Sequence, residues 1–397
     1  MDQKLLTATD ATLGLSLSGG GFRATLFHLG VLRRLNDLGL LSRMTLISSV
    51  SGGSILNGLL AVRWQRLRKG AGGIFTNFEE EVEQPVREFC SKNLRNYPLL
   101  TGRLDPRNWW NLAKDDYSAT NLLAEEYDSE LLGGATMQML SDILNAGGPR
   151  FVFCATNLAT GVNWRFDGKR MGDYQVGYTW KPEMTLGMAV AASSAFPLAF
   201  PPLVLELEGS QWEFGDLPDG ETRDEMRKKA HLTDGGVYDN MGLEPVWKKH
   251  DFVFCSDAGA PFGLEGEPGG NIASRLKRAS DIIDRQSRAL RRRMLIDAFD
   301  RKDYRGAFWG IATNIEEYPL EPKATGYTGG TLEAIGDIRT DLDVFTKGEQ
   351  LVLMNHGWLL SGAAIRAYCA EWADAASKAP DATLLDGSAA LAAVRKK

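Results

Sequence analysis

A glycine run followed by an arginine stands at residues 18–23, where the sequence is Ser-Gly-Gly-Gly-Phe-Arg. Backbone N–H groups in such a run are unobstructed by side chains, and those at a helix start favour negative charge. The run could stabilise an oxyanion during acyl transfer, cradle a phosphate, or form a structural turn. It also fits part of a dinucleotide-binding pattern, but the acidic residue which that pattern needs is missing from Ile47-Ser48-Ser49-Val50.

A serine between small residues forms the second motif, Ser49-Val50-Ser51-Gly52-Gly53. A nucleophile elbow needs small residues two positions before and after its serine, because the strand-to-helix turn is sharp. Ser49 and Gly53 meet this requirement, and Gly52 offers its N–H as a further oxyanion donor. The first position departs from the Gly-x-Ser-x-Gly pattern, so a turn whose serine caps a helix is the alternative interpretation.

An aspartate before two glycines forms the third motif, Thr233-Asp234-Gly235-Gly236. Alone, this pattern is typical of a turn. A serine nucleophile nevertheless needs a base, and the four histidines of the chain are His28, His231, His250 and His356. Only His231 lies near a candidate motif, so a Ser51–Asp234 pair is the economical interpretation.

The elements around these motifs alternate between strand and helix patterns. Leucines at every second position over 13–17 predict a strand, and apolar residues at helical spacing predict a helix from Ala24 to about Leu38. A strand over 44–50 and a helix over 53–68 repeat this order. Apolar runs at 151–158, 252–259 and 305–313 are further candidate strands. We therefore expect an α/β fold, a three-layer α/β/α sandwich with a mostly parallel central sheet.

The domain organisation is predicted to be a single domain over 1–397 with a motif-bearing core at about 13–260. A mostly helical insertion containing Trp109, Trp110 and Tyr117 is expected at about 70–149. A C-terminal helical part is expected at about 271–397. Within it, 271–299 is a helical pattern dense in cations, and a solvated face is the first expectation for such a pattern. The stretch 206–230 is short of apolar residues and predicts a surface loop.

The composition bounds the function. With 44% hydrophobic residues, the 397-residue chain can form a large core. Its net charge of −6 is not that of a typical nucleic-acid-binding protein, which carries an excess of basic residues. The four cysteines have no zinc spacing. The uncharged stretches 44–62 and 184–205 contain serines or prolines that favour buried segments lining a site over membrane spans. The first residues lack the pattern of a signal peptide, so we expect a cytoplasmic protein, peripheral at membranes.

The ordered set of Gly-Gly-Gly-Phe-Arg, Ser-Val-Ser-Gly-Gly and Asp-Gly-Gly resembles the patatin-like phospholipase family, which includes the cytosolic phospholipase A catalytic domains. A further Ser/Pro block of that family is matched by Ala192-Ser193-Ser194-Ala195-Phe196-Pro197. The resemblance covers residues 13–240 well and the remainder only loosely.

Roles for individual residues follow from this resemblance. It implies Ser51 as nucleophile and Asp234 as base, an oxyanion hole from the glycine run with Gly52, and a substrate or phosphate contact at Arg23. Motif support is expected from Gly53, Gly235 and Pro197. The expected oxyanion donors are Gly19, Gly20, Gly21 and Gly52.

The expected function is lipid acyl hydrolysis of phospholipase A or lysophospholipase type, through an acyl-enzyme on Ser51 and without cofactor or metal. Phospholipid or lysophospholipid substrate, transient contact with membrane surfaces and a small-molecule activator are the expected partners. The alternative is a nucleotide-sensing regulatory protein whose glycine loop binds phosphate. Because bacterial relatives of the family include nucleotide-activated defence phospholipases, the two functions could coexist.

Overall fold

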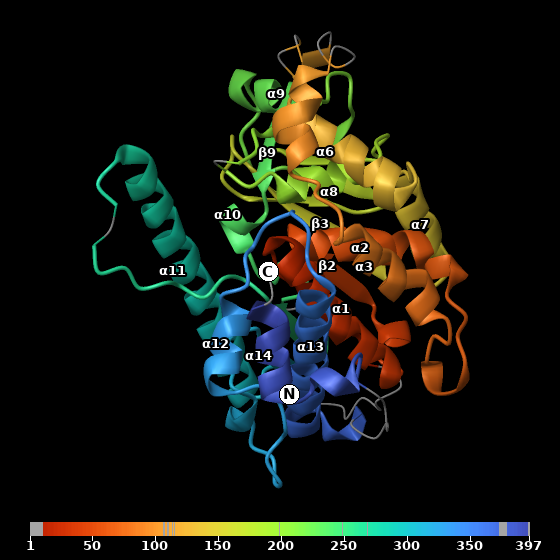
Figure 1. Ribbon diagram of the computed structural model, residues 1–397. Coiled ribbons are helices and arrows are strands. Elements are labelled where there is room, and N and C mark those ends of the chain that lie inside the picture. The colour runs from red at the N-terminus through yellow and green to blue at the C-terminus, as the bar shows by residue number, and fades with distance from the viewer. Residues whose placement is uncertain are drawn as a thin grey trace.

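An 11-stranded sheet runs through the part of the chain that the computed structural model describes (Figure 1). The described residues are 11–105, 108, 111–112, 114, 116–197, 199–247, 249–267, 269–372 and 379–395. Parallel pairs join five strands in the order β11 (Arg305–Gly310), β10 (Phe252–Asp257), β1 (Leu13–Leu17), β2 (Leu46–Ser49) and β3 (Arg150–Asn157). Leu15 of the central strand lies between Ile47 and Phe254 in this register.

Antiparallel strands extend the sheet beyond β3 on both of its edges. On one edge follow β4 (Asn163–Phe166), β5 (Arg170–Asp173), β6 (Gly177–Trp180) and β8 (Trp212–Glu213). On the other edge, the final residues of β3 pair with β9 (Lys229–Asp234), which in turn pairs with β7 (Leu203–Glu206). The sequence did not reveal this antiparallel half, because β4 to β8 are short strands of two to four residues.

Helices cover both faces of the parallel strands. One face packs against α1 (Gly21–Asp37), α2 (Gly52–Arg63) and α13 (Lys347–Tyr368) in the larger hydrophobic core. The other face is covered by residues 241–247 and by the C-terminal part of α11 (Ile272–Asp300), through Met241, Val246 and Leu295. The expected α/β/α sandwich with a parallel central sheet is thereby confirmed.

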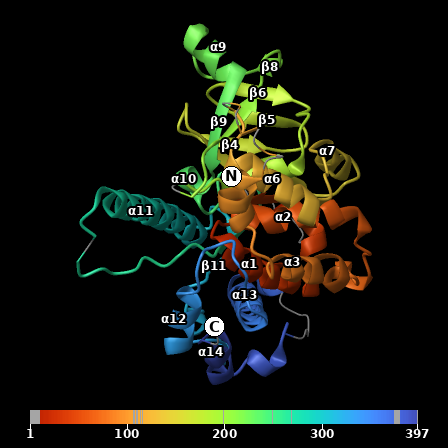
Figure 2. The same cartoon turned by 45° about the horizontal axis from the view of Figure 1, so that its top comes forward.

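The remaining helices lie around this core. They are α3 (Gln84–Phe89), α4 (Gly102–Leu104), α6 (Ala119–Tyr127), α7 (Gln138–Asn145), α8 (Leu186–Ser194), α9 (Glu221–Lys228), α10 (Gly236–Asp239), α12 (Gly329–Gly336) and α14 (Gly387–Arg395). Helix α11 differs from the others because most of its length projects from the body of the protein (Figures 1 and 2). No helix in the described ranges is both long enough and apolar enough to cross a membrane.

Two local expectations from the sequence differ from the structure. The stretch 206–230, expected as a loop, contains the short strand β8 and the exposed helix α9 as well as the start of β9. The helix expected over 53–68 is an α-helix only as far as Arg63, after which Trp64–Arg66 form a 3-10 helix.

Candidate active site

The register of β3 brings Ser51 and Asp234 together. Strand β2 pairs with β3 only as far as Ser49, opposite Phe153. Strand β9 runs antiparallel to β3 and pairs with the same edge of β3, over Ala155 to Asn157. The last residue of β9, Asp234, lies opposite Ala155. The carboxyl ends of β2 and β9 therefore face each other along one edge of β3, and the residue two positions beyond Ser49 meets Asp234.

Ser51 occupies a strained turn between β2 and α2. Its backbone has φ +50° and ψ −119°, a conformation that non-glycine residues rarely adopt and that costs roughly 1–3 kcal/mol. The turn is held because the Ser51 N–H donates to Ser193 Oγ at 3.0 Å and the Val50 N–H donates to the Leu17 carbonyl at 3.0 Å. This geometry is the one expected of a nucleophile elbow.

Ser193 is the centre of a buried hydrogen-bond network behind this elbow. Its hydroxyl donates to the Cys154 carbonyl at 2.6 Å and lies 2.9 Å from Ser54 Oγ. Ser54 in turn donates to Ser49 Oγ at 3.0 Å. The sequence placed Ser193 only within a family-like block, since nothing in its spacing shows that its hydroxyl reaches the turn of another motif.

Asp234 is buried, with 3% of its surface exposed. Burial raises the pKa of its carboxyl group to about 7, although the Gly236 N–H and a side-chain hydrogen bond with Ser51 both favour the charged form. The Gly236 N–H donates to Asp234 Oδ1 at 2.7 Å, and Thr156 Oγ1 donates to the Asp234 carbonyl at 2.9 Å. A carboxyl group with this pKa exchanges a proton readily near neutral pH.

The segment after α8 fixes the Asp-Gly-Gly turn from one side. The Ala195 carbonyl accepts from the Asp234 N–H at 3.0 Å and from Thr233 Oγ1 at 2.8 Å. The Gly235 N–H donates to the Ser193 carbonyl at 3.3 Å. Pro197 lies half-buried in the turn that follows. The uncharged stretch 184–205 thus supplies contacts to both candidate catalytic residues.

The glycine run lies directly against the elbow. A Cβ on Gly52 would lie 2.1 Å from the Gly21 carbonyl oxygen, and one on Gly53 would lie 2.5 Å from the Leu17 carbonyl oxygen. Gly20 has φ +141°, a conformation that favours glycine. Side chains at these positions would separate the two loops.

The N–H groups of the glycine loops differ in availability. The Gly19 N–H donates to the Asn240 carbonyl at 3.0 Å, so the expectation that Gly19 is an oxyanion donor does not fit its position. Within the described residues, the N–H groups of Gly20, Gly21 and Gly52 have no protein acceptor. Gly21 and Gly52 each begin a helix, where free N–H groups and the helix dipole favour an anion.

Arg23 lies away from any position where it could meet a substrate phosphate. Its side chain is 1% exposed and donates to the carbonyls of Gly336, Ile338 and Ala258 at 2.9, 2.7 and 2.8 Å. Burial lowers its pKa to about 10. Because every contact joins α1 to a main-chain segment, its role is structural, and the phosphate contact expected from the sequence is not supported.

No hydrogen bond in the described part of the chain joins a histidine to Ser51 or Asp234. His28 is fully buried beneath the glycine loop, where it contacts the Ser18 carbonyl at 3.0 Å and Ser256 Oγ at 2.8 Å, and burial lowers its pKa to about 4. His231 is exposed on β9 opposite Val204. His250 and His356 each contact a main-chain carbonyl.

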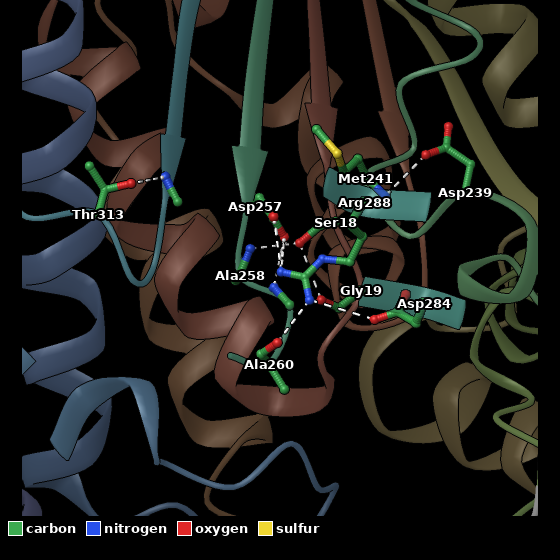
Figure 3. Close-up of polar contacts among 12 residues, drawn as sticks. Ser18, Gly19, Asp239, Met241, Asp257, Ala258, Ala260, Asp284, Arg288 and Thr313 are labelled. Carbon is green, nitrogen blue, oxygen red and sulfur yellow. Dashed lines mark hydrogen bonds and ion pairs between the residues drawn. The ribbon is translucent and has the colours of Figure 1, made fainter. Parts of the chain in front are cut away.

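A second polar cluster supports the glycine loop from the side of α11 (Figure 3). Ser18 Oγ accepts from the Ala258 N–H at 2.7 Å, which ties this loop to the end of β10. Arg288 of α11 contacts both carboxylate oxygens of Asp257 at 3.0 and 3.1 Å and donates to the Ala260 carbonyl at 2.8 Å. The C-terminal half of α11, which we call its base, is therefore connected to the candidate oxyanion loop through β10.

The expected contribution of the helical insertion can be followed only in part. Trp109 and Trp110 lie outside the described residues. Tyr117, which precedes α6, is described, and its hydroxyl donates to Glu125 near the end of that helix.

A comparison with protein families covers the part of the chain that contains this site. A family model described as patatin-like phospholipase matches residues 15–247, more than half of the chain and a span that contains Ser51 and Asp234. Among curated proteins, none matches the sequence.

Two solved structures of a human phospholipase share the fold at low sequence identity. Human GIVD cytosolic phospholipase A2 has a TM-score of 0.50 and 12% identity, over 99% of this chain and 62% of that chain. Its complex with methyl gamma-linolenyl fluorophosphonate gives a TM-score of 0.50 and 13% identity, over 100% of this chain and 61% of that chain. The chain thus spans about three fifths of the length of these human structures. VipD from Legionella pneumophila has a TM-score of 0.40 and 16% identity, over 91% of this chain and 69% of that chain.

Since the family model matches more than half of the chain, the protein belongs to the patatin-like phospholipase family.

Proposed function

We propose that this protein is a lipid acyl hydrolase that cleaves the carboxylic esters of phospholipids or lysophospholipids through an acyl-enzyme on Ser51. The observation that carries the proposal is the pairing of two features. Ser51 stands in a strained elbow, and its partner is a buried aspartate whose pKa of about 7 suits proton transfer.

In the first half of the reaction, Asp234 takes the proton of the Ser51 hydroxyl while the oxygen attacks the ester carbonyl. The N–H groups of Gly20, Gly21 and Gly52 hold the negative charge that develops on the carbonyl oxygen. The protonated Asp234 then gives its proton to the departing alcohol, which leaves the acyl group on Ser51.

In the second half, Asp234 takes a proton from water, and the resulting hydroxide attacks the acyl-enzyme. The same N–H groups stabilise the second oxyanion. When it collapses, the fatty acid leaves and the Ser51 oxygen recovers a proton from Asp234. The two residues return to their starting state, and the scheme uses no metal ion.

Exposed apolar side chains beside the pair support an acyl substrate. Phe196 is 53% exposed in the segment whose carbonyls hold Asp234, and Val237 is 50% exposed three residues after Asp234. Apolar surface at this position favours a hydrocarbon chain, because contact removes that surface from water. A cytoplasmic protein that visits membranes transiently would find such substrates there.

The test combines covalent labelling with product analysis. A fluorophosphonate should label Ser51 alone, as peptide mapping would reveal, and the purified protein should release free fatty acid from mixed phospholipid vesicles. Ser51→Ala should lose both signals while keeping the unfolding temperature of the parent. Labelling at Ser18, Ser54 or Ser194, or cleavage of peptides without any lipid ester hydrolysis, would contradict the proposal.

A further inference from the structure

Helix α11 has an unusual position for a helix of its length. At 29 residues it is about 44 Å long, and most of it stands away from the body of the protein (Figures 1 and 2). Among its described side chains, only those of Leu295 and Ala298 are buried, both close to its C-terminal end. The rest of the helix is therefore exposed and can contact another surface.

One of these faces is apolar. Its members are spaced by four, seven, seven and four residues, which places them on one side of a helix. They form what we call the α11 stripe: Ile272, Leu276, Ile283, Leu290 and Met294, each between 51% and 69% exposed. A run of large apolar side chains exposed along about six turns indicates a contact with something outside the described fold.

The helix is also strongly cationic within an acidic chain. It carries eight arginine and lysine residues and four aspartates, whereas the whole chain has a net charge of −6. Arg275 and Arg293 are 18 residues apart, which is five helical turns, so both flank the same side of the α11 stripe. Within the described residues, neither Arg275 nor Arg293 forms an ion pair with a carboxylate.

A hollow beside the stripe combines the same two properties. It has a volume of about 290 Å³ and is lined by apolar side chains, including Phe262 and Ile282, and by the guanidinium groups of Arg285 and Arg293. The Phe262 ring lies 4.5 Å from the Arg285 guanidinium carbon. Leu264, on the same loop, is 90% exposed. Apolar surface rimmed by arginines suits a ligand with an acyl chain and an anionic head group.

The base of α11 is joined to the loops of the candidate active site. Besides the contacts of Arg288 with Asp257 and Ala260 (Figure 3), Arg291 pairs with Glu244 at 2.8 Å and donates to the Tyr238 carbonyl at 3.2 Å. Tyr238 follows the Asp-Gly-Gly turn by two residues. A surface that binds α11 is thereby held in a defined orientation relative to Asp234.

From these observations we infer that α11 is a docking helix for an anionic phospholipid membrane. The α11 stripe lies in the interface between head groups and acyl chains, and Arg275 and Arg293, which flank it, contact lipid phosphates. Pairing of two α11 helices is disfavoured because each is cationic. The inference rests on the proposed function, since a lipid acyl hydrolase must reach substrate that is held in a bilayer.

The test measures binding separately from hydrolysis. In a Ser51→Ala background, which cannot consume the vesicles, sedimentation is measured with phosphatidylcholine vesicles with and without phosphatidylserine. The triple change Ile272→Ser, Leu276→Ser and Ile283→Ser should weaken binding at least about tenfold, because it removes most of the buried apolar area. Arg275→Gln with Arg293→Gln should abolish most of the preference for phosphatidylserine, again about tenfold.

A matched control uses exposed leucines elsewhere on the surface. Leu158 and Leu385 are 51% and 36% exposed and lie outside α11. Leu158→Ser with Leu385→Ser should bind vesicles like the parent. Binding that is equal for the stripe variant and this control would overturn the inference, as would a dimer that depends on the stripe in sedimentation velocity and forms without any vesicle binding.

Hydrolysis of a short-chain ester below its critical micelle concentration separates the two proposals. With Ser51 intact, the stripe variant should hydrolyse this dissolved ester at the rate of the parent. Its rate of hydrolysis on anionic vesicles should be at least about tenfold lower than that of the parent. Should the parent bind vesicles through the stripe yet hydrolyse no lipid ester, the proposed function fails while the docking helix stands.

Discussion

The loops around Ser51 and the helix α11 make opposite use of their side chains. Around Ser51, polar groups are buried and hydrogen-bonded, and a strained backbone persists because Ser193, Leu17 and the glycine loop hold it in place. Along α11, large apolar side chains are exposed and most cations face solvent. We therefore propose that chemistry and surface contact use separate parts of the protein, and contacts of Arg288 and Arg291 are among those that join them.

The largest expected effect comes from the candidate base. Asp234→Asn should lower kcat/KM for any ester by about 10³-fold, because an amide cannot take the Ser51 proton. His231→Ala should stay within about twofold of the parent, since His231 is exposed on β9. Initial rates on a dissolved ester measure both. An equal loss of kcat/KM in the two variants would indicate that a histidine takes part in the mechanism and would contradict the assignment of Asp234 as the only base.

The pH dependence tests the same carboxyl group without a mutation. Since burial raises the pKa of Asp234 to about 7, kcat/KM on a dissolved ester should rise about tenfold per pH unit below neutrality and level off above it. The α11 stripe variant should follow the same profile because it does not touch the pair. A flat profile between mildly acidic and mildly basic pH would contradict the assignment of the base.

Stability should move in the opposite direction to activity. In the unfolded chain the carboxyl group has a pKa of about 3.9, so between about pH 4 and pH 7 the folded state binds more protons than the unfolded state. In that window this group reduces the free energy of unfolding by roughly 1.4 kcal/mol for each unit of rising pH. Urea unfolding of Asp234→Asn should therefore show a stability advantage that grows with pH up to about 7. An advantage that does not change with pH would argue against a buried carboxyl group that titrates near neutrality.

Arg23 sharpens the contrast between a buried and a surface cation. Arg23→Met should lower the free energy of unfolding by roughly 3 kcal/mol, because it leaves three buried carbonyl acceptors without their charged donor. Arg275→Gln with Arg293→Gln should leave stability nearly unchanged. Urea unfolding compares the two. A higher KM for anionic vesicles in folded Arg23→Met, at parent stability, would instead support the phosphate contact.

The smallest of the expected effects concerns Ser193, a positioning residue. Ser193→Ala removes the acceptor of the Ser51 N–H, so the elbow loses a constraint and acylation by a fluorophosphonate should slow about tenfold. Ser194→Ala is the matched control, because Ser194 Oγ donates to the Val190 carbonyl within its own helix. An equal loss of acylation rate in the two variants would assign Ser193 a packing role only.

The motifs themselves were readable in the sequence because their chemistry is local. The glycine run, the small residues around Ser51 and the Asp-Gly-Gly turn each sit within a few residues of a strand end, and alternation of strand and helix patterns predicted the parallel core. The family also followed from their order along the chain. These features depend on residue type and short spacing, which sequence carries directly.

Other features depended on contacts between distant segments. That β9 runs antiparallel along the end of β3 decides that Asp234 faces Ser51, and the length of β2 decides where this occurs. The Gly19 N–H is occupied by the Asn240 carbonyl and Arg23 by carbonyls more than 200 residues away, so neither takes the role that its motif predicted. Burial of Asp234, which sets its pKa, and the exposure of the α11 stripe are likewise properties of the folded chain. Sequence determines which groups are present, whereas only the tertiary structure decides which of them are already partnered, because a hydrogen-bond donor is used by whatever acceptor the fold brings to it.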